Sequence, residues 1–465
     1  MNYNLLDEKW IPVLYKNGSW DCIGIRQALK EAHIIRQIAA SNPMDRVAIF
    51  RFLLALLYWC RGSPQENTRG RFDEPFPEDW FVRLDENRDC FNLFGDGKRF
   101  YQDRSARRNR PATDLIQEIP TGNNFWHFRH SIDEKDGLCP ACCALGLLRL
   151  PLFSVSGRPD LKSGINGSPP VYVVPWGPSL ADTVKANWTP QGELGVPAWV
   201  KPDIRPPEDD EVPLLTGLTV LARRVWLHDP ETPGTCVNCG TKTTTLVRTC
   251  EFQSAGEETN DRWNDPHVVY LDRTPRKALR APDLTAAGRF KMDRPWTVLM
   301  ERIVESGKFV SEKTPRSLLV VGFATDQAKN IDVWERTIRL PSRESIQRNS
   351  SMIELWDKQG WLIGKRMERI CRSKVAGAAA SAAIRPHIEH EVSADVSALL
   401  TGDEEAWQQA AEEYGTLVGK MPRSLAPGFS TAAVKLQKDV AYTVPDMRPK
   451  TEETKKPVRK KGGEK

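Results

Sequence analysis

The sequence lacks the long apolar segments of a membrane protein and any recognisable signal peptide. Its most apolar run, from Val47 to Cys60, has only fourteen residues and contains Arg51, whereas crossing a bilayer takes about 20 apolar residues. We therefore expect a soluble, cytoplasmic protein. The run itself predicts a largely buried helix that begins near Asn42-Pro43 and ends at Arg61-Gly62.

The sequence also lacks the short motifs of common hydrolases, nucleotide-binding enzymes and dehydrogenases. It contains no G-x-S-x-G, no G-x-x-x-x-G-K-[ST], no H-E-x-x-H and no Rossmann glycine pattern. His387 and His390 lie beside Glu389 at a spacing that could mimic a metal pair, but Pro386 precedes them and no third ligand is near. These absences favour a binding or scaffolding protein over an enzyme.

Most of the chain has no excess of charge of either sign, because the net charge of +5 arises near its end. Residues 448–465 carry eight Lys/Arg and three Glu, which leaves the preceding residues formally neutral. A neutral body does not bind nucleic acid indiscriminately, so any such contact must come from local patches. The tail 448–465 has too little apolar content to fold, and either a solvated end or an anchor would fit it.

Four cysteines form the most informative pattern. They occur as two C-x-x-C hooks, Cys139 with Cys142 and Cys236 with Cys239, which we expect to lie in tight turns. Four thiolates match a closed, tetrahedral structural Zn²⁺ site. Closing the 93-residue loop between the hooks (143–235) costs about 1.6 kcal/mol more than closing one of ~15 residues. Structural zinc returns roughly 10–16 kcal/mol in small peptides, so the metal easily offsets this cost.

Two other roles for the hooks fit less well. A C-x-x-C pair can be a redox dithiol, but the surrounding sequence shows no thioredoxin-like βαβ pattern. Disulfides are unusual in a chain without a secretory signal. Cys143 could replace a ligand, but the two-residue spacer favours Cys142, and we expect Cys143 to be packed. The other five cysteines are interpreted as small apolar residues: Cys22, Cys60, Cys90, Cys250 and Cys371.

Two segments suggest contacts with nucleic acid. The run 121–130 interleaves aromatic side chains with Arg and His, which suits base stacking or equally an aromatic plug over the zinc module. The loop 154–170 contains Gly157, Gly164 and Gly167 around Lys162, which could neutralise a phosphate. Glycine-rich Gly95-Asp96-Gly97 lacks the flanking strand and helix of a phosphate cradle, and the aromatic residues around it indicate core packing.

The periodicity predicts an α+β chain. A short strand is expected within 4–13 that leads to a hairpin turn at Asn17-Gly18, with further strands at 171–174 and at 318–323, a helix over 25–33 and another over 144–150 that stops at Pro151. For 218–227 the pattern leaves a strand and a short helix open. From about Ser350 the pattern becomes helical. The domains expected are a large mixed domain over 1–340 with the embedded zinc module, a four-helix type bundle over 341–447, and the disordered basic tail over 448–465.

The order of these motifs resembles that of the CasA family, the large subunits of the type I-E CRISPR Cascade complex. The resemblance rests on the opening Asn4-Leu5-Leu6 with Trp10-Ile11-Pro12-Val13, on the aromatic patches 91–94 and 100–102, and on the paired hooks flanking Lys162-Ser163-Gly164, followed by a helical bundle. It extends from residue 4 into the bundle and weakens after about residue 400.

The resemblance implies that the protein reads the protospacer-adjacent motif in double-stranded DNA, starts unwinding and helps to recruit a helicase-nuclease. Base pairing with a guide RNA then reads the longer sequence. The implied partners are the other Cascade subunits, the guide RNA, the target duplex and the helicase-nuclease. No catalytic residue is implied, and the zinc is structural.

The resemblance also implies site residues. Gln327 matches the family's glutamine wedge, with Asp326, Ala328 and Lys329 beside it. The family's glycine loop falls on 156–160, where Gly157 is kept but Arg158-Pro159-Asp160 replaces further glycines, so the motif preference is open. The family's groove-reading lysine has no confident match, and Phe252-Gln253 stand near its place. Phe128 and Arg129 match a loop that contacts the guide RNA and a neighbouring subunit.

Two other functions are compatible with the sequence. One is a zinc-stabilised protein-protein adaptor that does not touch DNA. The other is an enzyme that modifies nucleic acid through His and acidic residues that form no recognisable constellation.

Overall fold

The computed structural model describes residues 3–64, 74–118, 137–156, 161–255, 260–273, 276–280, 306–311, 316–326, 329–340 and 342–344, with the single residues 303 and 347. The chain divides into two compact units. The first comprises Met1–Leu284, Arg302–Phe309 and Arg316–Ile338; the second comprises Thr285–Glu301, Val310–Pro315 and Arg339–Lys465. Apart from residues 342–344 and 347, the expected bundle lies outside the described residues, as do the tail, Cys371 and the His387–His390 segment.

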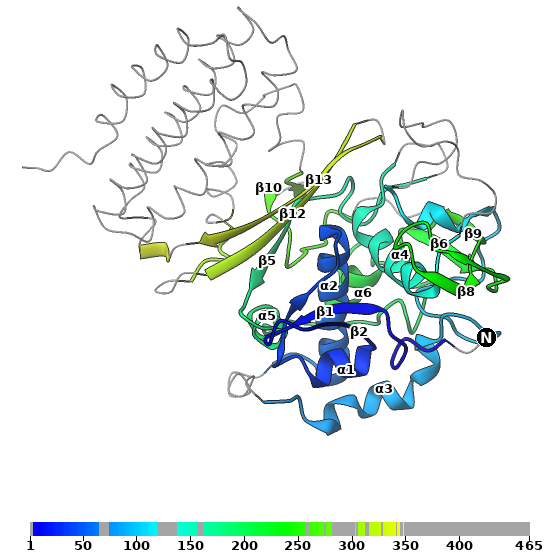
Figure 1. Cartoon of the computed structure of the whole chain (residues 1–465). Coiled ribbons are helices and arrows are strands. Elements are labelled where there is room, and N and C mark those ends of the chain that lie inside the picture. The colour runs from blue at the N-terminus through cyan, green and yellow to red at the C-terminus, as the bar shows by residue number, and fades with distance from the viewer. Residues whose placement is uncertain are drawn as a thin grey trace, which may run out of the picture. The chain divides into compact units, whose positions relative to one another are not determined.

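Helix α2 (Pro43–Arg61) runs through the middle of the first unit (Figure 1). Its N-cap is Asn42, whose side-chain oxygen accepts a hydrogen bond from the Met44 amide at 2.8 Å, and Gly62 ends it with a φ of 75°. Most of its residues are buried on all sides, which confirms the predicted helix. No helix in the described ranges is both long and apolar enough to cross a membrane.

The N-terminal segment forms a small antiparallel sheet of order β2-β1-β3 beside α2. The hairpin joins β1 (Ile11–Tyr15) to β2 (Trp20–Ile23), and Gly18 adopts the positive φ of 86° that its turn needs. After α1 (Ile25–Lys30), β3 (Ile35–Ile38) pairs with the other edge of β1.

A second sheet has the order β13-β12-β5, in which β5 (Tyr172–Trp176) pairs antiparallel with β12 (Arg316–Asp326). Strand β13 (Lys329–Leu340) is the neighbour of β12 on its other side. The apolar runs at 171–174 and 318–323 are thus buried strands, as predicted. The chain returns to this sheet across a large sequence separation.

The remaining sheets position the cysteines and the basic residues of the first unit. Strands β4 (Asn109–Pro111), β9 (Thr249–Ser254) and β6 (Arg223–Leu227) form a sheet of order β4-β9-β6. Strand pairs β7 (Thr232–Thr235) with β8 (Lys242–Leu246), and β10 (Tyr270–Arg273) with β11 (Arg276–Ala278), form two-stranded ribbons. Within the described ranges the other α-helices are α3 (Val82–Glu86), α4 (Pro140–Phe153), α5 (Leu180–Asn187) and α6 (Leu214–Thr219).

The structure answers one open local prediction and contradicts another. The segment 218–227 contains both alternatives, the end of α6 followed by β6. Pro151 does not end its helix, because α4 continues to Phe153. Proline near the last turn removes only one backbone hydrogen bond, whereas the added turn buries Phe153 completely, where its ring meets Tyr172 at 5.3 Å and Phe323 at 6.2 Å.

Aromatic side chains fill the core of the first unit. Phe52 of α2 meets Phe100 at 5.2 Å and Trp199 at 5.6 Å between ring centroids, both edge to face. The patches at 91–94 and 100–102 therefore pack in the core, as the density of aromatic residues predicted, and they do not form a phosphate cradle.

Candidate metal centre

The first cysteine hook opens helix α4. Cys139 is the N-cap residue and Pro140 occupies the first helical position. A spacing of three on a helix places Cys139 and Cys142 on one face, and the partial positive charge of a helix N-terminus favours thiolates there. The expected tight turn is therefore the first turn of a helix.

Two contacts fix this hook. Leu138 exchanges backbone hydrogen bonds of 2.9 Å each way with Val247, directly before the helix. Further along α4, buried Arg149 donates to Asp45 of α2 through two nitrogens, and to Glu118 at 2.6 Å. The helix that carries Cys139 is thereby anchored to the central helix through a fully buried ion pair.

The second hook is the turn between β7 and β8. The Cys236 amide donates to Thr241 at 2.9 Å, and the Gly240 amide donates to Cys236 at 2.9 Å. Gly240 has a φ of 72°, which the turn requires and which glycine adopts without strain. This hook lies in a tight turn, as predicted. The Val237 amide donates to Gly137 at 3.2 Å and so joins the two hooks directly.

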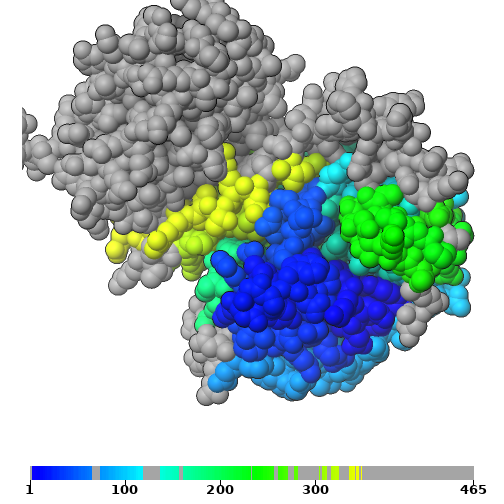
Figure 2. Space-filling model, in the orientation of Figure 1, coloured from blue at the N-terminus to red at the C-terminus, as the bar shows by residue number. Residues whose placement is uncertain are grey.

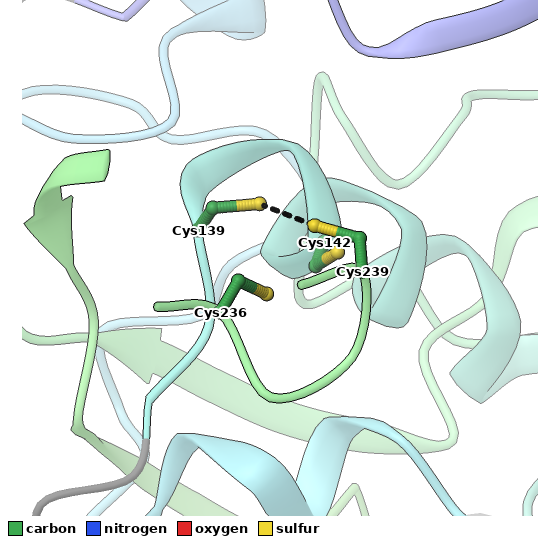
Figure 3. Close-up of side chains that lie close together, drawn as sticks. All are labelled: Cys139, Cys142, Cys236 and Cys239. Carbon is green, nitrogen blue, oxygen red and sulfur yellow. Dashed lines mark hydrogen bonds between the residues drawn. The ribbon is translucent and has the colours of Figure 1, made fainter. Parts of the chain in front are cut away.

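The four sulfurs converge on one point (Figure 3), and all lie within 4.8 Å of one another. Cys139 Sγ and Cys239 Sγ are 3.7 Å apart. A tetrahedral Zn²⁺ with Zn–S bonds of about 2.3 Å separates its sulfurs by about 3.8 Å, so the observed spacing suits such an ion. Asn238 donates to Cys142 Sγ at 3.3 Å, a contact that helps to orient a thiolate ligand.

All four donor atoms are sulfurs, which are soft ligands. Cys139, Cys142 and Cys236 are buried, and only Cys239 is exposed. Hydrogen bonds from the Cys139 and Cys142 thiols hold the pKa of Cys236 far below its usual range, while contact with its sulfur neighbours raises the pKa of Cys142. Cys143 points elsewhere into the core, where burial raises its pKa well above the usual value. The four-cysteine set is compatible with a metal ion, and Cys143 is packed as expected.

The module borders a cavity of about 1070 Å³. Figure 2 shows the N-terminal strands in dark blue and the β7–β8 region in green side by side on one face. Both line the cavity, with Trp20, whose side chain is 61% exposed, on one side and Val237 on the other.

The residues expected to contact DNA or RNA lie mostly outside the described ranges. These are Gly157, Arg158, Gln327, Ala328, Phe128 and Arg129. Asp326 is the last residue of β12 and Lys329 the first of β13, which are neighbouring strands. Lys162 is exposed, and its backbone is held from β6 and β9: its carbonyl accepts from Arg223, and its amide donates to Ser254 Oγ at 3.2 Å.

The G-x-x-G segment is a tight turn that packs against Pro151 and Asp265. The Gly167 amide donates to Gly164 at 2.8 Å, and Gly167 has a φ of 75°. A Cβ on Gly164 would meet the Pro151 carbonyl oxygen at 2.7 Å, so only glycine fits there. Asn166, inside the turn, donates to Asp265 Oδ2 at 2.9 Å.

Asp265 belongs to a buried polar network that the sequence did not indicate. Arg51 of α2 donates to both its carboxylate oxygens, at 2.6 and 2.8 Å. Arg51 Nη1 also lies 2.9 Å from His267 Nδ1, and His267 Nε2 lies 3.0 Å from Asn187 Oδ1. Since the guanidinium can only donate, His267 is neutral with its proton on Nε2. The only signal in the sequence was Arg51, a charge within an apolar helix.

The position near the family's groove-reading lysine lies on β9. Phe252 faces the core, and Gln253 is partly exposed opposite Arg224 of β6.

The comparisons with known proteins agree with one another. The family model described as CRISPR-associated protein Cse1 matches residues 4–444. A CRISPR-associated protein CasA/Cse1 from Thermus thermophilus is 28% identical over 385 residues, covering 73% of this chain and 71% of the relative. The crystal structure of Cse1 from Acidimicrobium ferrooxidans shares the fold with a TM-score of 0.65 at 19% identity, covering 97% of this chain and 99% of that one.

A chain of a structure described as a CRISPR RNA-guided surveillance complex matches with a TM-score of 0.62 at 15% identity, covering 95% of this chain and 99% of that one. The predicted resemblance is confirmed, since the family model covers almost the whole sequence. This chain belongs to the CRISPR-associated Cse1 (CasA) family.

Proposed function

We propose that this chain is the large subunit of a type I-E Cascade surveillance complex that reads the protospacer-adjacent motif in duplex DNA. The observation that most directly supports this proposal is the family match over residues 4–444, and the likeness in fold to a chain of an RNA-guided surveillance complex adds to it. Its partners are the other Cascade subunits, the guide RNA, the target duplex and a helicase-nuclease, and it acts in the cytoplasm.

In this proposal the side chain of Gln327 separates the two DNA strands. Strand β12 ends at Asp326 and its neighbour β13 begins at Lys329, so the sequence between them contains only Gln327 and Ala328. A side chain carried on paired strands can be pushed between base pairs and exchange stacking energy for separation. Asp326 and Lys329 flank it, and Lys329 supplies a charge for the adjacent phosphate.

The loop 156–160, with Gly157 and Arg158, reads the minor groove, and Lys162 neutralises a phosphate beside it. Arg223 supports this assignment, because it donates to the carbonyl of Val155 at 2.9 Å and to that of Lys162 and so holds both ends of the loop. Arg158 in place of a glycine gives this loop a cation that suits a narrow groove. Phe128 and Arg129 contact the guide RNA or a neighbouring subunit.

The cysteines hold a structural Zn²⁺. Four sulfurs at the observed spacing leave no open coordination position for water, so the ion stiffens the module. The protein therefore binds and scaffolds, and degradation of the target belongs to the helicase-nuclease that it helps to recruit.

The test is Gln327→Ala in the reconstituted complex. We expect duplex opening next to the motif, followed by the fluorescence of an unstacked base analogue, to slow by roughly tenfold or more, since one wedge offsets a few kcal/mol of unstacking. Assembly with the guide RNA should stay intact. Gln27→Ala, on the exposed side of α1, is the matched control and should open DNA at the wild-type rate. Unchanged opening in Gln327→Ala would remove the wedge assignment.

A further inference from the structure

A second concave site lies beside β6, away from the cysteines. It is a cavity of about 490 Å³ whose lining is rich in cations and contains one aromatic ring. The cations that line it are Lys98, Arg99, Arg104 and Arg224, its carboxylates are those of Asp103 and Asp203, and the ring is that of Trp226. The sequence over 98–110 has six Lys/Arg and one acidic residue, Asp103. We call the exposed part of this site, formed by Lys98, Arg104 and Trp226, the Trp226 surface.

The segment that carries these cations is fixed to the edge of β6. Among the described strands, β6 pairs with β9 alone, and residues 99–103 cover its other side. The Asp103 amide donates to Val225 at 2.9 Å, and Gln102 accepts from the Leu227 amide at 2.9 Å. Arg99 donates to the Leu227 carbonyl at 2.7 Å. Arg99 and Gln102 thus complete a strand edge, and the cations beside them are held in place before any ligand binds.

The charges of the cavity are unequally neutralised. Arg99 lies 3.7 Å from Asp229, and Arg224 lies 3.5 Å from Asp103. Lys98 and Arg104 are exposed, and within the described part of the chain no carboxylate lies within ion-pair distance of either. Two cations therefore face solvent from a rigid segment, and they are available to an anion.

Trp226 packs against two arginines of the cavity. The Arg99 guanidinium lies 4.0 Å from the centroid of the indole ring, and the Arg104 guanidinium lies 5.6 Å from it. These cation–π contacts hold the arginines against the ring. The exposed groups beside the ring are the cations Lys98 and Arg104, so the site suits phosphates.

The strand that carries Trp226 also holds the base of the loop that we assign to DNA. Arg223, the neighbour of Arg224 on β6, holds the carbonyls of Val155 and Lys162 at either end of 156–161. Opposite Arg223, Ser254 of β9 accepts the Lys162 amide. The same two strands therefore carry the base of the loop and the edge on which Lys98 and Arg104 are mounted.

We propose that the Trp226 surface binds the phosphate backbone of the target duplex next to the motif, through Lys98 and Arg104. This inference rests on the proposed function, because the adjoining loop is taken to contact DNA. The contact is independent of sequence: it adds affinity and orients the duplex, and the loop supplies the discrimination.

The test measures the salt dependence of duplex binding by the assembled complex. Each phosphate neutralised by a cation contributes about −0.9 to the slope of log K against log salt concentration. Lys98→Gln with Arg104→Gln should make the slope less steep by about 1.8, and Lys98→Gln alone by about 0.9. Binding should weaken equally on motif-bearing and motif-free duplexes, so their affinity ratio stays the same.

The control removes the same charges elsewhere. Lys16→Gln with Arg36→Gln, both exposed on the β2-β1-β3 side of the unit, should leave the slope unchanged. An unchanged slope in the Lys98 and Arg104 variants would overturn the proposal, and so would a defect confined to guide-RNA loading, which would assign the surface to RNA. Failure of the proposed function has a different signature: the wild-type complex would bind motif-bearing and motif-free duplexes equally.

Discussion

The buried His267 should make the first unit lose stability as the pH falls below about 6.5. Burial and, second to it, the adjacent Arg51 guanidinium lower the pKa of His267 to about 3. In the unfolded chain a histidine has a pKa of about 6.5. Between these values the unfolded state binds a proton that the folded state rejects, so stability rises with pH in this window.

The size of the effect follows from the unfolded pKa alone while the folded pKa lies well below the measured pH. At pH 5 the linkage relation gives a loss of about 2 kcal/mol relative to pH 7.5. Asp265 does not add to this loss. Burial alone would raise its pKa, but the Arg51 guanidinium holds it well below the usual range, so its contribution disappears only at pH values below about 4.

Hydrogen exchange provides a local measurement. The Val173 amide of β5 donates to the His267 carbonyl at 2.8 Å, so peptides that span β5 report the opening of this region. After correction for intrinsic exchange, the opening free energy should fall by about 2 kcal/mol from pH 7.5 to pH 5 in the wild type. His267→Gln, which can still accept from Arg51 or donate to Asn187, should lack this fall. A control, His228→Gln at the end of β6, should keep it. An equal fall in all three proteins would refute the assignment to His267.

Two further predictions concern the cysteine module and its anchor. Cys236→Ala should release the metal, because three thiolates lose most of the roughly 10–16 kcal/mol that a full structural site supplies. The measurement is the zinc content per chain by mass spectrometry. Cys143→Ala should keep the metal, and equal retention by both variants would contradict the site. Arg149→Met leaves the Asp45 carboxylate buried without its cation and should cost about 3–5 kcal/mol in urea unfolding, whereas Arg149→Met with Asp45→Leu should cost clearly less; similar losses would mean that the ion pair does not anchor α4.

Features written in adjacent residues were predictable from the sequence. The caps Asn42 and Gly62, the turn at Gly18 and the four convergent cysteines each depend on a local pattern, and the structure confirms them. Pro151 misled the prediction because the burial of Phe153 decides where α4 ends, and burial depends on distant strands. The wedge and loop assignments stay predictions, since they rest on the resemblance and lie largely outside the described residues.

The buried polar network was not predictable, for a related reason. Arg51 and Asp265 are more than two hundred positions apart, and neither occurs in a motif. A sequence shows that Arg51 interrupts an apolar helix and therefore needs a partner, because a buried charge is costly without one. It does not show which of the many carboxylates is that partner. Only the packing of β5 and α2 brings Asp265 and His267 to it.

Helix α2 thereby links the two parts of the unit to which we assign function. Asp45 and Arg51 are six residues apart, which places them about 120° apart around the helix. Asp45 binds Arg149 and orients the helix of the first cysteine hook, while Arg51 binds Asp265, which holds Asn166 in the G-x-x-G turn. Apolar pairs of the same volume could match the stability of these ion pairs, but they would not fix direction as bidentate hydrogen bonds do. The two buried arginines therefore act as orienting contacts: they tie the cysteine module and the G-x-x-G turn to the same central helix.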